Sequence, residues 1–123
     1  MSGGRSALLV GFARGLQAAI GDLLQRHGFE VENVPGPDHA VLRVRTTPPH
    51  LLVITGRCGV DGLLTIMGEL GAPRRTRIVV LLPGPDPVAE KQYRAAGVRV
   101  VLRMPVGAED LLRRAGVGEA DPG

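Results

Sequence analysis

The stretch Pro49-His50-Leu51-Leu52-Val53-Ile54-Thr55 decides the fold of this chain. Its residues 51–54 form a continuous apolar run without polar alternation. Such a run predicts a strand that is buried on both faces, as strands are in the middle of a parallel sheet. The next four residues, Gly56-Arg57-Cys58-Gly59, contain two glycines, so a tight turn is expected directly after the strand.

Similar apolar runs lie on both sides of this stretch, and each is followed by a segment with helical spacing. The predicted strands cover residues 7–10, 29–34, 51–54, 78–82 and 98–102. Helices are predicted over about 16–24, 38–44, 61–70, 87–96 and 108–115. Asp38 and Asp86 are expected as helix caps and Asp61 just before its helix, and helices end near Gly28, Gly71 and Gly97. Five strand–helix units predict an α/β, flavodoxin-like parallel sheet of order 2-1-3-4-5 with helices on both faces.

The composition fits one small globular domain with an aliphatic core. The chain has 123 residues, of which 44% are hydrophobic and only 2% aromatic. We expect a domain over residues 1–115 and a flexible tail over 116–123. The net charge is +3, but the arginines are scattered and few aromatic rings are present to stack on bases, which argues against direct nucleic-acid binding. No apolar stretch is long enough to span a membrane, so a cytoplasmic protein is expected.

The residues that most often bind metals or act as nucleophiles are sparse. Cys58 is the single cysteine, which excludes an internal disulfide and a site with several cysteine ligands. A reactive thiol at Cys58 would need a lowered pKa, for which the neighbouring Arg57 is a candidate cause, whereas the alternative is a plain glycine-flanked turn. The three histidines, at positions 27, 39 and 50, have no ligand spacing, so no cofactor is expected.

Several local features together resemble the receiver domain of two-component response regulators. They are Pro49-His50 leading into an apolar strand, Asp61-Gly62 at a helix start, Ala95-Ala96-Gly97 before the last strand, and Met104-Pro105 where receivers carry Lys-Pro. Their order and spacing cover residues 7–114. The resemblance implies the flavodoxin-like fold, with a phosphorylation site at the carboxyl ends of the strands.

In receivers this site needs five polar positions, and the chain departs from all of them. Gly11 and Phe12 match the two metal-binding acids, Thr55 the acceptor aspartate, Leu82 the Thr or Ser after strand 4, and Met104 the lysine. Mg²⁺ prefers carboxylate oxygens, and phosphoryl transfer needs charge neutralisation. We therefore expect no tight Mg²⁺ site, no aspartyl phosphorylation and no enzymatic activity. Leu82 and Met104 are expected to fill the vacated pocket, with Phe12 either joining them or pointing outward.

These observations support two hypotheses for function. The first is a phosphorylation-independent pseudo-receiver, a regulatory module in signal transduction that forms a homodimer or binds an output protein. Because receivers commonly precede DNA-binding domains, transcriptional regulation is its plausible context. Its expected partner face is made by Glu90, Lys91, Arg94, Arg99, Arg103, Glu109, Asp110 and Arg113. The alternative is a small-molecule-sensing domain that uses the apolar former phosphorylation pocket.

The segment Pro83-Gly84-Pro85-Asp86-Pro87 bears on the first hypothesis. In receivers this region moves on activation, whereas three prolines restrict the backbone. The segment is either part of a locked conformation or simply a stiff loop.

Overall fold

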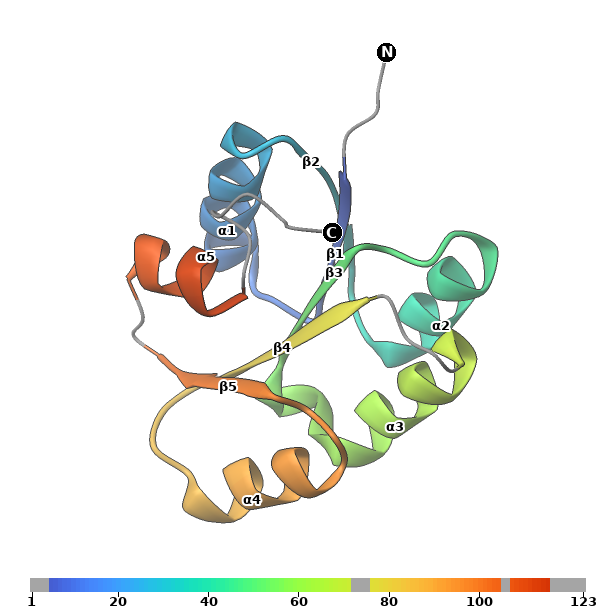
Figure 1. The fold of residues 1–123 in the computed structure, drawn as a ribbon, viewed down its shortest axis with the longest axis vertical. Coiled ribbons are helices and arrows are strands. Elements are labelled where there is room, and N and C mark those ends of the chain that lie inside the picture. The colour runs from blue at the N-terminus through green and yellow to red at the C-terminus, as the bar shows by residue number, and fades with distance from the viewer. Residues whose placement is uncertain (1–4, 72–75, 105–106, 116–123) are drawn as a thin grey trace.

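The computed structural model describes residues 5–71, 76–104 and 107–115, within which five parallel strands alternate with helices (Figure 1). The predicted tail, residues 116–123, lies outside the described residues. The strands are β1 (Arg5–Val10), β2 (Phe29–Val34), β3 (Leu51–Thr55), β4 (Arg77–Leu82) and β5 (Val100–Arg103). The helices are α1 (Arg14–Arg26), α2 (Pro37–Thr46), α3 (Gly59–Leu70), α4 (Pro87–Ala95) and α5 (Ala108–Ala115), with a 3₁₀ turn, η1 (Gly56–Cys58). The sheet order β2-β1-β3-β4-β5 confirms the predicted fold class.

Strand β3 occupies the middle of the sheet, as its apolar run predicts. Val53 pairs with Leu9 of β1 on one side and with Val79 of β4 on the other. All five residues of β3 are buried. Because successive side chains of a strand point to opposite faces, β3 contributes alternately to two hydrophobic clusters, one on each face of the sheet.

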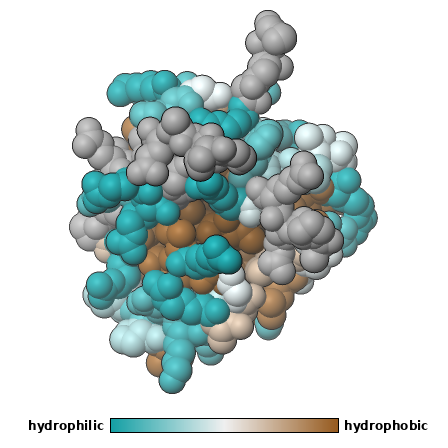
Figure 2. Space-filling model, in the orientation of Figure 1, coloured by the Kyte–Doolittle hydropathy of each residue, from teal (hydrophilic) through white to brown (hydrophobic). Residues whose placement is uncertain are grey.

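Helices cover both of these faces (Figure 1). On one face, Leu24 of α1 and Leu111 of α5 belong to the cluster that includes Val53. On the other face, the cluster around Leu52 contains buried residues of α2, α3 and α4: Ala40, Val44, Leu63, Ile66, Met67 and Tyr93. Figure 2 shows an apolar area between α5 and β4 that is framed by hydrophilic side chains. The core therefore consists of two apolar layers separated by the sheet.

Three helices begin at different residues from those predicted. Helix α1 begins at Arg14, and its N-cap, Ala13, provides no side-chain hydrogen bond. The N-cap of α2 is Gly36, so Asp38 lies in the first turn and the prediction of Asp38 as the cap is wrong. Asp61 likewise lies inside the first turn of α3 rather than before the helix. Both carboxylates still lie where the positive end of a helix dipole stabilises them.

The start of α4 agrees with the prediction, whereas β5 is displaced. Asp86 Oδ1 accepts the backbone N–H of Ala89 at 3.0 Å, and Pro87 occupies the first turn. The predicted strand over 98–102 is observed at Val100–Arg103. The first residue of that prediction instead completes the end of α4, because the N–H of Val98 donates to the carbonyl of Tyr93 at 3.1 Å.

Replacing a side chain in the middle of the sheet tests this packing. Leu52 is 0% exposed, so Leu52→Ala should lower the free energy of unfolding by about 2–5 kcal/mol in urea titration, through lost burial and the cavity left behind. Leu42 on α2 is 58% exposed, and the matched Leu42→Ala variant should change stability by no more than about 0.5 kcal/mol. Equal effects of the two substitutions would contradict the placement of the core.

Candidate functional site

The carboxyl ends of β1, β3, β4 and β5 surround a pocket of about 260 Å³. It lies beside the point where the strand order reverses between β1 and β3, the usual location of binding sites in open α/β sheets. The residues that line it are Gly11, Phe12, Ala13, Leu16, Thr55, Arg57, Leu81, Pro83 and Met104. None of these described lining residues is acidic.

The fold brings together four of the five positions at which the sequence departs from receivers. Gly11, Phe12, Thr55 and Met104 all line the pocket. Phe12 and Met104 are partly buried and pack against the cluster on the α1–α5 face. Phe12 therefore joins the pocket rather than pointing outward.

Leu82 does not line the pocket, contrary to the expectation that it fills the vacated space. Neighbouring side chains of β4 point to opposite faces, so Leu81 lines the pocket while Leu82 belongs to the cluster on the α2–α4 face. Its Cδ2 lies so close to Gly56 that a Cβ at that glycine would be only 2.6 Å away. The expectation of a filled pocket is wrong as well, since the hollow remains open.

Gly11 lines the pocket at the position that matches one of the two metal-binding acids of receivers. Its φ of +82° lies in the region that favours glycine. A Cβ at this position would lie 2.8 Å from both Thr55 Cγ2 and Cys58 Sγ. An acidic residue here would therefore adopt a strained φ and would require the side chains of Thr55 and Cys58 to reorient.

Thr55 and Arg57 supply polar groups at the pocket. Thr55 is only 7% exposed, and its Oγ1 accepts the backbone N–H of Arg57 at 3.4 Å. The hydroxyl hydrogen of Thr55 has no acceptor among the described residues. The Arg57 side chain is exposed at the rim, and within the described part of the chain no carboxylate pairs with it.

The N-terminus of α1 borders the same pocket. Ala13 and Leu16 line it, and the first turn of α1 contains no acidic residue. The first amides of a helix lack partners within the helix and carry partial positive charge. The polar surroundings of the pocket are therefore electropositive.

Cys58 is not the activated thiol that one hypothesis required. Partial burial raises the pKa of the Cys58 thiol above its ordinary value of 9.0. Its side chain packs against the cluster on the α2–α4 face. The neighbouring Arg57 therefore does not produce a reactive thiolate, and Cys58 is better described as part of the packing behind Gly11.

This conclusion can be tested by alkylation. We expect Cys58 to react with iodoacetamide more slowly than a free cysteine at neutral pH, because a raised pKa leaves less thiolate. The rate, followed by intact-mass spectrometry as pH rises, should increase with a midpoint above that of free cysteine measured in parallel. A midpoint below that of free cysteine would show an activated thiol.

Tyr93 ties α4 to the turn that follows β3. Its hydroxyl donates to the carbonyl of Gly56 at 3.0 Å. Burial, together with the nearby Cys58, raises the pKa of Tyr93 above 10.0, so the phenol keeps its proton and remains a donor. Tyr93 is not among the residues predicted from the sequence, although a single tyrosine on the apolar side of a predicted helix was a usable signal.

The predicted partner face on α4, β5 and α5 contains charges that are partly paired within the chain. Glu90 and Arg94 form an ion pair at 3.2 Å, and Arg94 also donates to the carbonyl of Arg99 at 3.1 Å. Asp110 pairs with Arg113, while the side chain of Glu109 lies outside the described residues.

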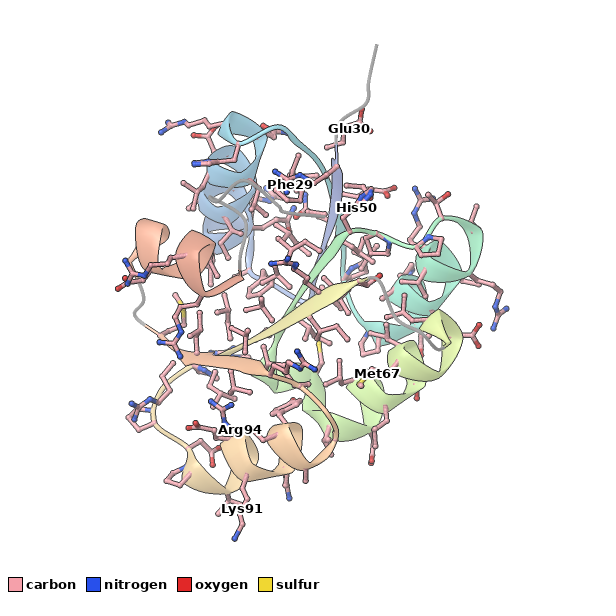
Figure 3. All side chains as sticks on the ribbon, in the orientation of Figure 1. Phe29, Glu30, His50, Met67, Lys91 and Arg94 are labelled. Atoms are coloured by element: carbon pink, nitrogen blue, oxygen red, sulfur yellow. The ribbon has the colours of Figure 1, made fainter. Side chains whose placement is uncertain are left out.

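Three cations of this face, Lys91, Arg99 and Arg103, are exposed, and no carboxylate of the described residues forms an ion pair with them. Figure 3 shows Lys91 pointing away from the body of the protein. Because the acids are engaged and these cations are not, the described part of the face is net basic.

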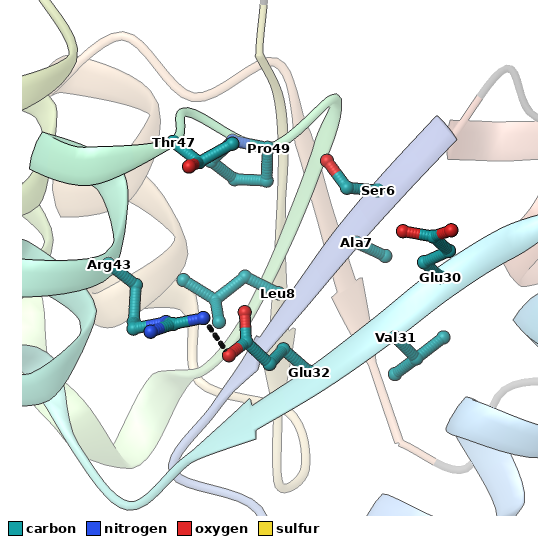
Figure 4. A pocket seen from close by; sticks show the side chains of 9 residues that line it. All are labelled: Ser6, Ala7, Leu8, Glu30, Val31, Glu32, Arg43, Thr47 and Pro49. Carbon is teal, nitrogen blue, oxygen red and sulfur yellow. Dashed lines mark hydrogen bonds and ion pairs between the residues drawn. The ribbon is translucent and has the colours of Figure 1, made fainter. Parts of the chain in front are cut away.

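A second hollow, of about 340 Å³, lies between β2 and α2 (Figure 4). Its lining includes Ser6 and Leu8 of β1, and an ion pair between Glu32 and Arg43 joins its two sides. It borders the start of β1 rather than the carboxyl ends of the strands, where ligands bind in this class of fold. The pocket at the carboxyl ends is therefore the better candidate site.

Within residues 5–71, 76–104 and 107–115, no three His, Cys, Asp or Glu side chains are grouped so that they could hold a metal ion. In the same ranges, no helix is both long and apolar enough to cross a membrane.

Solved structures share the fold over most of the chain. A response regulator from Thermotoga maritima is 20% identical with a TM-score of 0.78, and the match covers 92% of this chain and 95% of that one. A response regulator from Burkholderia pseudomallei, with a phosphorylated aspartic acid, is 19% identical with a TM-score of 0.77, covering 90% of this chain and 66% of that one.

A LuxR-family DNA-binding response regulator from Staphylococcus aureus is 15% identical with a TM-score of 0.77 and covers 91% of this chain and 96% of that one. No family model matches the chain, and no curated protein matches it significantly in sequence. At these identities the likeness establishes that the chain has the receiver fold.

Proposed function

We propose that this chain is a phosphorylation-independent pseudo-receiver, a non-enzymatic regulatory module of signal transduction that acts by binding a protein. The observation that carries the proposal is the pocket at the carboxyl edge, where the described lining residues include an arginine and no acid. Mg²⁺ requires oxygen ligands, usually including one or two carboxylates, and phosphoryl transfer relies on the metal for positioning and charge neutralisation.

The packing around Gly11 supports the same proposal. At this position a side chain would collide with Thr55 and Cys58. The absence of the first acid is therefore accompanied by a positive φ and by side-chain packing that leaves no space for a Cβ in this arrangement. Thr55 has a hydroxyl, but without an adjacent base it is a poor nucleophile at neutral pH.

The position of α4 is consistent with a module that needs no phosphoryl switch. Tyr93 holds the helix to Gly56, and Asp86 caps its first turn. Both interactions form between groups of the chain itself, so neither needs a phosphoryl group to hold α4 in this position. This favours the interpretation of the proline-rich segment before α4 as part of a fixed conformation.

We expect the partner to bind at α4, β5 and α5. The exposed cations Lys91, Arg99 and Arg103 favour an acidic protein surface over a second copy of this chain, which would bring like charges together. Transcriptional regulation is the proposed context, and the DNA-binding character of the Staphylococcus aureus protein is consistent with it. A cytoplasmic location is part of the same proposal.

The first test uses a small phosphodonor. After incubation with acetyl phosphate and Mg²⁺, intact-mass spectrometry should detect only the unmodified chain. Thr55→Asp should remain unmodified too, because Gly11 and Met104 still provide neither a metal ligand nor a cation. Uptake of a phosphoryl group by the native chain would contradict the proposed function, and uptake by the variant alone would contradict the argument from Gly11.

The second test concerns the charges of the partner face. If these cations repel a second copy, the Lys91→Gln/Arg99→Gln variant should self-associate more strongly than the native chain in sedimentation velocity at low salt, and added salt should strengthen native self-association. The Arg14→Gln/Arg26→Gln variant, which removes two exposed charges from α1 instead, is the charge-matched control. If added salt weakens self-association, the charges attract two copies of the chain. That result would favour a homodimer over an acidic partner protein.

The open pocket favours a second candidate function, a small-molecule-sensing domain. The side chains expected to fill the former phosphorylation site leave about 260 Å³ unoccupied. Apolar walls with a few polar groups are typical of ligand sites. The partner face and the pocket use different surfaces, so a sensing pocket is compatible with the interaction module.

A further inference from the structure

The pocket at the carboxyl edge has the size and walls of a site for a small organic molecule. A water molecule occupies about 30 Å³ in the liquid, so the pocket volume corresponds to about nine waters. Phe12, Leu16, Leu81 and Met104 provide apolar walls. A small hydrated ion would leave these walls in contact with water, whereas a short hydrocarbon chain or ring would cover them.

The polar side of the pocket offers hydrogen-bond donors to an anion. The guanidinium of Arg57 carries donors in a planar fork that matches a carboxylate. The hydroxyl of Thr55, nine-tenths buried, has a hydrogen without an acceptor among the described residues. The N-terminus of α1, whose N-cap Ala13 makes no side-chain hydrogen bond, also borders the pocket and adds backbone N–H groups.

Arg57 is the arginine that lines this pocket, and its charge is not balanced by a carboxylate of the described residues. Five arginines each pair with a carboxylate of the chain: Arg26, Arg43, Arg45, Arg94 and Arg113. Arg57 forms no such pair within the described residues, although it lines a pocket. Of the nearby acids, Asp86 is engaged in capping α4, and neither it nor Asp61 lines the pocket.

We propose that this pocket binds a small apolar carboxylate, with its anionic group at Arg57, Thr55 and the start of α1 and its apolar part against Phe12 and Met104. The proposal rests on the small-molecule-sensing function and specifies its ligand class. It reverses the charge preference of the site, since receivers use acids here to hold a cation. A divalent cation is disfavoured by Arg57, and inorganic phosphate gains nothing from the apolar walls.

The test compares hexanoate with hexanamide, which has the same chain but no charge. Both probes are titrated into the full chain and followed by the amide signals in two-dimensional NMR. Hexanoate should bind about tenfold more tightly than hexanamide, as expected of a hydrogen bond to a charged group. The largest shifts should occur at Gly11, Thr55 and Arg57.

Two matched variants identify the anion-binding group. Arg57→Gln removes a charge from an exposed side chain in a turn and should reduce hexanoate affinity about tenfold, to the level of hexanamide. Arg26→Gln makes the same change at an exposed position at the end of α1 away from the pocket, and should leave both affinities unchanged.

The outcomes separate this proposal from the function on which it rests. Equal binding of hexanoate and hexanamide would leave a ligand pocket but contradict its preference for an anion. No shift with either probe would contradict both. Inorganic phosphate that binds as well as hexanoate would show a bare anion site and contradict the role of the apolar walls. Hexanoate binding that Arg57→Gln leaves unchanged would contradict the role of Arg57 as the anion-binding group.

Discussion

The burial of β3 on both faces is the constraint on which the rest of this structure depends. Each fully buried aliphatic side chain contributes about 1.5–3 kcal/mol relative to an exposed one, so the strand is stable only when both of its faces are covered. Strands β1 and β4 must flank it, and helices must cover both sides of the sheet. Thr55, the buried polar residue at its end, marks where the chain leaves the core and begins the turn at the pocket.

The close packing at the carboxyl edge follows from that arrangement. Gly11 lies against Thr55 and Cys58, and Gly56 lies against Leu82. At these two glycines the side chains of Thr55, Cys58 and Leu82 occupy the space that a Cβ would need. The shape of this edge thus depends on side chains packed against glycine positions as well as on the residues that line the pocket. This is why restoring a single polar side chain would not recreate the metal site of a receiver.

The sequence predicted the architecture well because the strands are continuous apolar runs with clear stops. It predicted the helix starts less well. The N-cap residues Ala13 and Gly36 form no side-chain hydrogen bond with their helices, so no typical capping residue marks these starts in the sequence. It also predicted that Gly11, Phe12, Thr55 and Met104 lie close together, because the carboxyl ends of parallel strands share an edge of the sheet. All four line the pocket.

The sequence misplaced Leu82, because the side of a strand to which a residue points depends on register, and a shift of one residue reverses it. The unfilled pocket and the bond between Tyr93 and Gly56 depend on tertiary packing, which periodicity does not report.

The turn η1 connects the two surfaces that the proposals use. Arg57 of this turn lines the pocket, and Gly56 of the same turn accepts the hydrogen bond from Tyr93 of α4. A ligand at Arg57 and a partner on α4 would therefore act on one three-residue segment. Such proximity becomes coupling only if the turn has two arrangements that the ligand distinguishes. In the structure the turn is held by Thr55 on one side and Tyr93 on the other, so a second arrangement that moves Arg57 away from Thr55, or Gly56 away from Tyr93, would break the corresponding hydrogen bond.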